Sequence, residues 1–155
     1  MKVKGIGQAK AITIAAAMEL GRRREAAMLE KPRIRDGRDA AAYLQFMLKN
    51  HRQEVFAAIY LNSAGKILHF GILSKGGLTS TVADPRIIFR KALEEEATSI
   101  ILCHNHPSGS LRPSRADEDC TRKIKEGAKN LDLKLMDHII VSEEGYYSFA
   151  DKGLL

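Results

Sequence analysis

The amino-acid sequence predicts an α/β fold in which a mixed β-sheet is flanked by helices. Three observations lead to this fold class. After an N-terminal helical segment, segments with helical and with strand patterns follow one another in the order α, β, β, α, β, α, β, β. Two of the strands are joined by a short turn, and the chain of 155 residues suits one compact domain with a short appendage. The hydrophobic fraction of 45% is that of an ordinary globular protein.

Helical segments are recognised by composition, by spacing and by their first residues. Alanine and other good helix formers dominate the first segment, and apolar residues recur at helical spacing in the second. Asp84 and Pro85 supply an N-cap and a first-turn proline for the third. The fourth is charged and amphipathic. These helices are expected at residues 8–26, 39–49, 84–97 and 114–130.

The strand segments are short and apolar. Residues 54–61 are β-branched, aromatic and apolar almost without interruption, which is typical of a strand covered on both faces. The turn at residues 62–65 joins this strand to a second one at 66–73, so the two are expected to form a hairpin. Further strands are expected at residues 99–103, 133–142 and 146–149.

The chain is expected to divide at Pro32. Residues 1–31 contain too few large apolar residues for a core of their own, which predicts a short N-terminal helical remnant. Residues 32–155 hold all the strands and the remaining helices, and they are expected to form the main domain.

Basic residues are concentrated near the N-terminus. The chain has a net charge of +6 and a pI of about 9.4, and residues 1–30 contain six basic and three acidic residues. This excess favours an acidic partner, nucleic acid being the usual one. Arg22–Arg24 are equally consistent with a solvated helix end, where cations interact favourably with the helix dipole.

Membrane and secretory signals are not found in the sequence. No apolar stretch approaches the roughly 18 residues that a membrane span needs, and the N-terminus lacks an apolar signal region. We therefore expect no membrane partner and a cytoplasmic location. Cys103 and Cys120 form no Cys-x-x-Cys pair, and they are expected to be reduced, partly buried thiols.

The segment 101–117, ILCHNHPSGSLRPSRAD, contains a candidate metal site. His104 and His106 are two residues apart, and that spacing places both imidazoles on one face of a strand. Asp117 follows after a loop rich in glycine and proline, and two histidines with one carboxylate are a common ligand set for catalytic zinc. Taken singly, each residue also has a structural interpretation. In particular, Ser114 and Asp117 have the pattern of a helix start, with Ser114 as the N-cap.

Two other metal-dependent enzyme classes fit the segment less well. The letters H-N-H also name a nuclease motif, but its histidines lie far apart in a ββα-metal arrangement, so the spelling is coincidental. A zinc deaminase requires H-x-E followed by P-C-x-x-C, and neither pattern is present.

The same residues resemble a known family. His104, His106 and Asp117, with Ser114 three residues before the aspartate, match the JAMM motif of MPN-domain zinc hydrolases. The sequence HNHPSG followed by PSRAD and Thr121, with DPR upstream and DHIIV downstream, is similar to the bacterial RadC family over essentially the whole chain.

The resemblance implies an MPN/JAMM architecture, which is cytidine-deaminase-like, and one Zn²⁺ per chain. It implies His104, His106 and Asp117 as zinc ligands, Glu54 as the general base on a metal-activated water, and Ser114 as a donor to the developing oxyanion. The implied reaction is hydrolysis of an amide or isopeptide bond in a peptide or protein substrate. Asp137 and His138 either orient a ligand imidazole, or His138 is a structural histidine, which is the commoner case in a strand, and neither is counted as catalytic.

The N-terminal segment carries a second resemblance. Residues 4–10 resemble the hairpin and second helix of a helix-hairpin-helix element, which RadC proteins carry ahead of the MPN domain, and the first helix of that element is missing. The resemblance implies a DNA-phosphate contact near Gly5, Gly7 and Lys10, through backbone amides at a helix start. The alternative function is therefore a DNA-binding or DNA-repair accessory protein with a structural zinc site.

Overall fold

The computed structural model describes residues 7–29, 32–48, 51–76 and 84–155, the side chains of 22–29 excepted. The chain separates into two compact units, residues 1–32 and 33–155. The first unit contains α1 (Gln8–Leu29), which begins where the carbonyl of Gly7 accepts a hydrogen bond from the N–H of Ala11 at 3.0 Å. The helix is three residues longer than the predicted range of 8–26.

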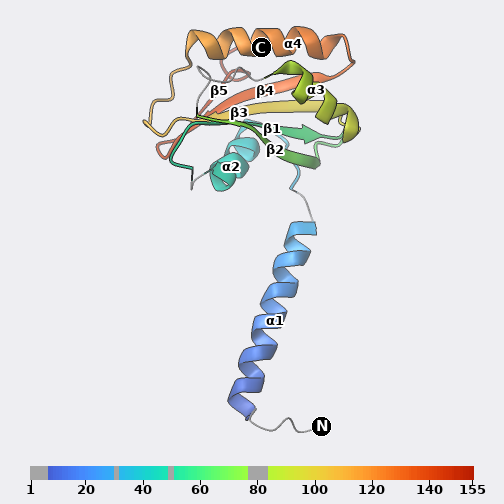
Figure 1. Ribbon diagram of the computed structural model, residues 1–155, viewed down its shortest axis with the longest axis vertical. Coiled ribbons are helices and arrows are strands. Elements are labelled where there is room, and N and C mark those ends of the chain that lie inside the picture. The colour runs from blue at the N-terminus through green and yellow to red at the C-terminus, as the bar shows by residue number, and fades with distance from the viewer. Residues whose placement is uncertain (1–6, 30–31, 49–50, 77–83) are drawn as a thin grey trace. The chain divides into compact units, whose positions relative to one another are not determined.

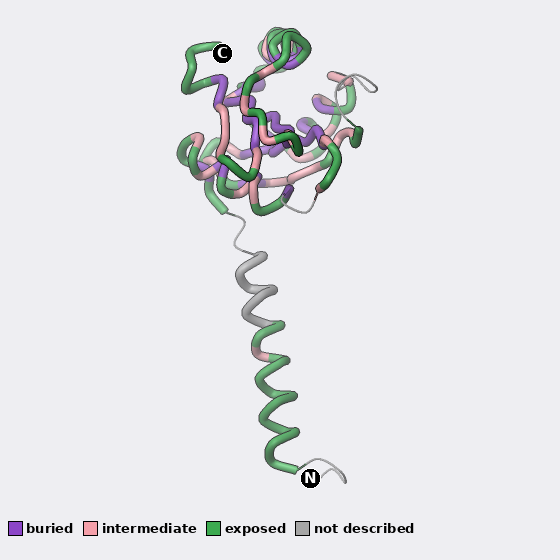
Figure 2. Tube along the Cα trace, turned by 90° about the vertical axis from the view of Figure 1, so that its left-hand side faces the viewer, coloured by how far each residue is buried: buried purple, intermediate pink, exposed green. Residues whose placement is uncertain are grey.

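The described side chains of α1 are exposed except that of Glu19, which is half-buried (Figure 2). Large apolar residues are among them, since Ile12 is 61% exposed, Met18 72% and Leu20 68%. Burial within this unit therefore contributes little to the helix, and the high helix propensity of its alanine-rich sequence favours it instead.

The second unit is built on a five-stranded mixed sheet in the order β2-β1-β3-β4-β5. The β3–β4 pair is parallel and the other pairs are antiparallel, which confirms the predicted mixed sheet and the β1–β2 hairpin. The strands are β1 (Val55–Leu61), β2 (Ile67–Lys75), β3 (Ser99–Asn105), β4 (Lys134–Val141) and β5 (Tyr146–Ser148).

Helices cover both faces of this sheet (Figure 1). On one face, α2 (Gly37–Leu48) packs its buried residues against alternate residues of β1. On the other, α3 (Pro85–Glu94) and α4 (Arg115–Lys129) pack against the remaining β1 residues. All seven residues of β1 are buried, as its nearly continuous apolar sequence predicts.

Local signals set the helix ends. Asp84 caps α3 by accepting a hydrogen bond from the N–H of Arg86 at 2.9 Å, and Pro85 occupies the first helical position. The helix ends at Glu94, earlier than predicted, because Glu96 takes a left-handed conformation with φ of 51° and the N–H of Ala97 donates to the Ala92 carbonyl at 2.9 Å.

The strand β3 extends two residues beyond the predicted range of 99–103. Its extra length comes from pairing on both sides, because His104 lies opposite Phe56 of β1 and Ile140 of β4. The backbone of His104 is thus held within a central strand of the sheet and not in a loop.

Candidate metal centre

The two histidines lie at the carboxyl end of β3. His104 is on the strand and only 3% exposed, whereas His106 follows the strand and is half-buried. Their Nε2 atoms lie 2.9 Å apart. The spacing of two residues thus turns both rings toward one point, as predicted.

Asp117 reaches the same point from the first turn of α4. Its side chain is 1% exposed and belongs to a capping box with Ser114. The N–H and the hydroxyl of Ser114 both donate to Asp117 Oδ2 at 2.7 Å, and the N–H of Asp117 donates to Ser114 Oγ at 3.2 Å. Helix capping thereby fixes the orientation of the carboxylate.

The other carboxylate oxygen of Asp117 has no hydrogen-bond donor among the described residues. Oδ1 is buried and lies 3.4 Å from His104 Nε2. A buried acceptor left without a partner costs about 1–3 kcal/mol, and more when it is charged. An occupant of opposite charge would remove that cost.

The position of the proton on the His106 ring leaves Nε2 as an acceptor in the cluster. Its Nδ1 lies 2.6 Å from the carbonyl of Ser110, and a carbonyl can only accept, so Nδ1 carries the proton. For the uncharged ring, Nε2 then presents a lone pair toward His104 and Asp117. The geometry therefore collects acceptor atoms around one point.

The three side chains together fit a metal ion. One ligand atom from each of His104, His106 and Asp117 lies within 4.8 Å of the others. Ligands held at about 2.0–2.1 Å on a tetrahedron stand about 3.3 Å apart. The observed separations of 2.9 Å and 3.4 Å lie on either side of that value.

Electrostatics keep the buried imidazoles uncharged. Burial lowers the pKa of His104 to about 4, although the Asp117 carboxylate acts in the opposite direction. Burial also lowers the pKa of His138 well below its usual value, with His104 and His106 contributing in the same direction. Neutral imidazole is the form that binds metals.

Glu54 lies beside the three-residue cluster without being part of it. It directly precedes β1, its side chain is 42% exposed, and its Oε1 is 3.7 Å from His106 Nε2. The carbonyl of Glu54 accepts a hydrogen bond from the N–H of Gly76 at 2.8 Å, which ties the residue to the end of β2. The structure thus brings all five predicted site residues of the main domain together.

His138 of β4 contacts a cluster residue directly. Its Nε2 lies 3.0 Å from His104 Nδ1, and its Nδ1 lies 2.6 Å from Thr121 Oγ1. Asp137, its neighbour, instead accepts hydrogen bonds from Ser148 and Ala150 and so joins β4 to the chain end. Sequence reasoning left the role of His138 open and did not assign one to Thr121 or Ser110.

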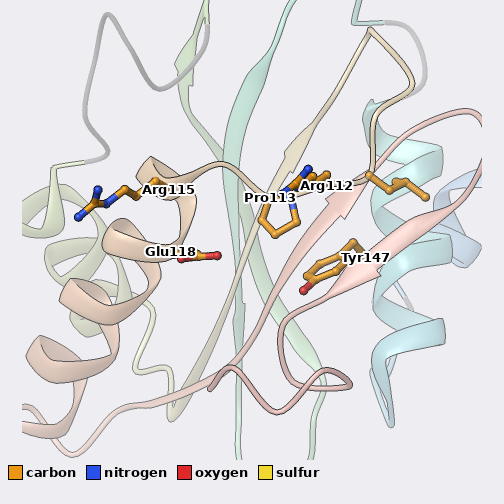
Figure 3. Close-up of a pocket in the computed structure, with 6 residues that line it drawn as sticks. Arg112, Pro113, Arg115, Glu118 and Tyr147 are labelled. Atoms are coloured by element: carbon orange, nitrogen blue, oxygen red, sulfur yellow. The ribbon is translucent and has the colours of Figure 1, made fainter.

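Two hollows adjoin these residues. The larger, of about 960 Å³, is lined by His106, the loop that follows it, α2 and the turn at 142–144. The smaller, of about 580 Å³, lies beside the start of α4. In Figure 3, Glu118 of α4 and Tyr147 of β5 extend into the smaller hollow from opposite sides, and Arg115 points away.

The predicted DNA contacts belong to the other unit. Gly7 and Lys10 lie at the start of α1, where both are exposed, whereas Gly5 lies outside the described residues.

Among the helices that the structure describes, none has the length and apolar character needed to cross a membrane.

Comparison with known proteins gives a consistent result. Residues 34–154 match the family model described as RadC-like JAB domain. A UPF0758 protein of Flavobacterium johnsoniae is 46% identical over 155 residues, which cover 99% of this chain and 68% of the relative. UPF0758 proteins of Streptococcus sanguinis and Porphyromonas gingivalis are each 44% identical, and the matches cover 66% and 68% of their lengths and 97% and 98% of this chain. These names state no reaction.

Proposed function

The chain belongs to the RadC-like JAB domain family, and on that premise we propose that it is a zinc-dependent hydrolase of the JAMM metallopeptidase type. Its substrate would be a peptide or protein, cleaved at an amide or isopeptide bond. The observation that carries this proposal is the buried Oδ1 of Asp117, which has no hydrogen-bond donor in the described part of the chain and faces two imidazole nitrogens with Glu54 close by.

His104, His106 and Asp117 would hold the zinc ion. Two imidazoles and a carboxylate suit zinc and leave a fourth position for water or substrate. The bound ion would act as a Lewis acid, which polarises a carbonyl and lowers the pKa of water to about 7.

Glu54 has the position of a general base. Its carboxylate is half-exposed and lies next to His106, so water can reach it and a proton that it accepts can be passed on to a leaving amine. A carboxylate that only completed a structural site would instead be expected among the buried ligand atoms.

The hydroxyl of Ser114 would have two roles, as a hydrogen-bond donor to Asp117 and as a donor to the oxyanion. In the structure its proton is directed to Asp117 Oδ2, and donation to an oxyanion requires the hydroxyl to turn away. The carboxylate keeps the N–H of Ser114 during such a turn, because that group donates to the same oxygen at 2.7 Å. Asp117 is therefore still held when the hydroxyl serves the reaction.

The larger hollow supports a substrate of peptide size. About 960 Å³ lies beside His106, and its walls combine the apolar Phe46 and Leu48 with polar loops. We further propose a cytoplasmic location, which the buried free thiols of Cys103 and Cys120 support.

Metal analysis and hydrolysis together test the proposal. Purified protein should contain about one zinc ion per chain, and the double variant His104→Ala/His106→Ala should lose it. Incubation with a peptide library followed by mass spectrometry should reveal new termini. Glu54→Gln should keep the zinc ion and produce none of them. Zinc content that is the same in the double variant, or cleavage that is the same in Glu54→Gln, would contradict the proposal.

The second candidate is the DNA-binding accessory role with a structural zinc site. Exposed Lys10 and the helix start at Gly7 favour it. DNA binding through this segment should weaken steeply with salt and should be lost when residues 1–31 are removed. A structural site would also show no cleavage that depends on Glu54.

A further inference from the structure

A continuous chain of buried polar groups leads away from His104. It runs from His104 on β3 to His138 on β4, from there to Thr121 on α4, and ends at the backbone carbonyl of Asp117. His104, His138 and Thr121 are 3%, 0% and 2% exposed. Water therefore cannot replace any of these partners without a rearrangement of the core.

The positions of the hydrogens follow from the far end of the chain. The carbonyl of Asp117 can only accept, and Thr121 Oγ1 lies 2.6 Å from it, so the single hydroxyl proton of Thr121 points to that carbonyl. The short contact between Thr121 Oγ1 and His138 Nδ1, also 2.6 Å, then needs a proton from the imidazole. His138 thus carries its proton on Nδ1.

The position of the proton on His104 follows from that on His138. His138 is 0% exposed, and burial disfavours a charged ring, so its Nε2 has a lone pair and accepts from Nδ1–H of His104 at 3.0 Å. His104, also uncharged, then has no proton on Nε2, the nitrogen that faces His106 and Asp117. Each of the three contacts along this chain of groups then has one donor and one acceptor.

We propose that Thr121, acting through His138, locks His104 in the tautomer whose Nε2 is free to bind a metal ion. Without the hydroxyl, His138 Nδ1 loses its acceptor and the ring can take the other tautomer. Its Nε2–H then points at His104 Nδ1 and drives the His104 proton onto Nε2. The nitrogen needed for the metal is thereby blocked. Thr121 and His138 are positioning residues, and their consequence for metal binding rests on the proposed function.

The surrounding aromatic rings limit any other response of His138. Phe149 stacks on it with ring centroids 4.9 Å apart and an interplanar angle of 14°, and Phe56 meets it edge-on at 5.7 Å. These two aromatic contacts therefore restrict movement of the His138 ring. A change at Thr121 is expected to alter the proton positions of His138 rather than the place of the ring.

This chain of contacts also joins β3 and α4, the two elements that carry His104 and Asp117. Ligand histidines commonly donate to a carboxylate or to a carbonyl directly. Here an uncharged imidazole and a hydroxyl stand between His104 of β3 and the backbone of Asp117 on α4. The groups that support His104 are thus uncharged, and among the three proposed ligands the charge is that of Asp117.

Nitrogen-15 NMR of the metal-free protein tests the lock directly. Wild-type His104 should be protonated on Nδ1 and unprotonated on Nε2. Thr121→Ser keeps the hydroxyl and should retain this pattern, whereas Thr121→Val should move protonation of His104 partly or wholly to Nε2. A wild-type protein with its His104 proton on Nε2 would overturn the proposal without any variant, even if Thr121→Val failed to fold.

Zinc affinity, measured by competition with a chelator, gives the second readout. Thr121→Val should weaken zinc binding by about 10–100-fold, and Thr121→Ser should recover most of that loss. Thr98→Val is the matched control, because the Thr98 hydroxyl donates to the Leu61 carbonyl outside the chain of contacts. Equal losses in Thr121→Val and Thr121→Ser would reject the lock. A wild-type protein that binds no zinc would reject the proposed function, while the tautomer measurement would still decide the lock.

Discussion

Asn105 Oδ1 accepts a hydrogen bond from the backbone N–H of Val55 at 2.7 Å. The residue between the two histidines is thereby joined to the first residue of β1, directly after Glu54. The Asn105 amide also donates to the carbonyls of His51 and Gln53, each at 3.2 Å. Asn105, which is 7% exposed, thus fixes the segment that carries the candidate base against the strand end that carries the candidate ligands.

Asn105→Ala should therefore separate catalysis from metal binding. Loss of three hydrogen bonds, with the Val55 N–H left unpaired, should lower the free energy of unfolding by about 2–3 kcal/mol. Hydrolysis at saturating zinc should fall because Glu54 is no longer held in place, while zinc affinity changes little. Urea unfolding, chelator competition and cleavage assays measure the three quantities.

Asn62→Ala is the matched control for this variant. Asn62 Oδ1 also accepts two backbone N–H groups, at 3.0 Å each, but it does so in the β1–β2 turn. It should lose some stability and keep its activity. Activity that survives in Asn105→Ala as fully as in Asn62→Ala would show that Asn105 does not position Glu54.

Asp117→Asn should reduce zinc binding and stabilise the metal-free protein. The amide oxygen can replace Oδ2 as the acceptor for Ser114, and the amide nitrogen can then donate toward His104 Nε2, which lies 3.4 Å from Oδ1. An unpartnered buried acceptor is thereby replaced by a donor, for a gain of about 1 kcal/mol. Thermal unfolding in the presence of a chelator measures the gain, and a lower Tm than wild type would contradict it.

Ser114→Ala should affect both folding and chemistry. Loss of the N-cap should lower the free energy of unfolding by about 1 kcal/mol. If the hydroxyl also serves an oxyanion, kcat should fall by about 10²–10³-fold. Ser114→Thr retains a hydroxyl and a capping residue and should recover much of both. A kcat for Ser114→Ala close to that of the wild type would remove the oxyanion role and leave only capping.

Tyr60→Phe should be neutral or stabilising at neutral pH. The hydroxyl of Tyr60 is buried in the core and has no hydrogen-bond partner among the described residues, so its removal leaves no donor or acceptor unpaired. An unpaired buried hydroxyl costs about 1–3 kcal/mol, of which the variant should recover a part. A clear loss of stability in urea unfolding would reveal a partner for the hydroxyl.

The same tyrosine should make the protein sensitive to alkali. Burial raises the pKa of Tyr60 from 10.0 to about 12, and Glu94 and Glu95 act in the same direction. Between these values the unfolded chain loses the proton that the folded protein keeps, so the free energy of unfolding falls as the pH rises through this window. Unfolding followed from neutral to alkaline pH should show a smaller decline in Tyr60→Phe than in the wild type.

Much of the fold could be predicted because its signals are local. The apolar run of β1 indicated a strand covered on both faces, and Asp84 with Pro85 marked the start of α3. The end of α3 was predicted too late, because the left-handed turn at Glu96 is not evident from its residue type. The length of β3 was underestimated because His104 is polar, although pairing with two neighbouring strands holds it in the sheet.

The candidate site was likewise predictable only where its residues are close in the chain. His104 with His106 and Ser114 with Asp117 are close in the chain, and strand and helix periodicity alone place each pair on one side. Strand and helix periodicity do not predict the contacts between different elements. Asn105 meets Val55 across 50 residues, and His104 and Thr121 meet His138 across 34 and 17 residues.

The sequence by itself thus determined which residue types could bind a metal ion and how each pair is presented. The family resemblance implied that the two pairs and Glu54 form one site, but only the tertiary structure shows the distances between them and the contacts by which His138 and Thr121 support His104. The physical reason is that these distances are set by the register of β1, β3 and β4 and by the packing of α4 on the sheet, which no local pattern encodes.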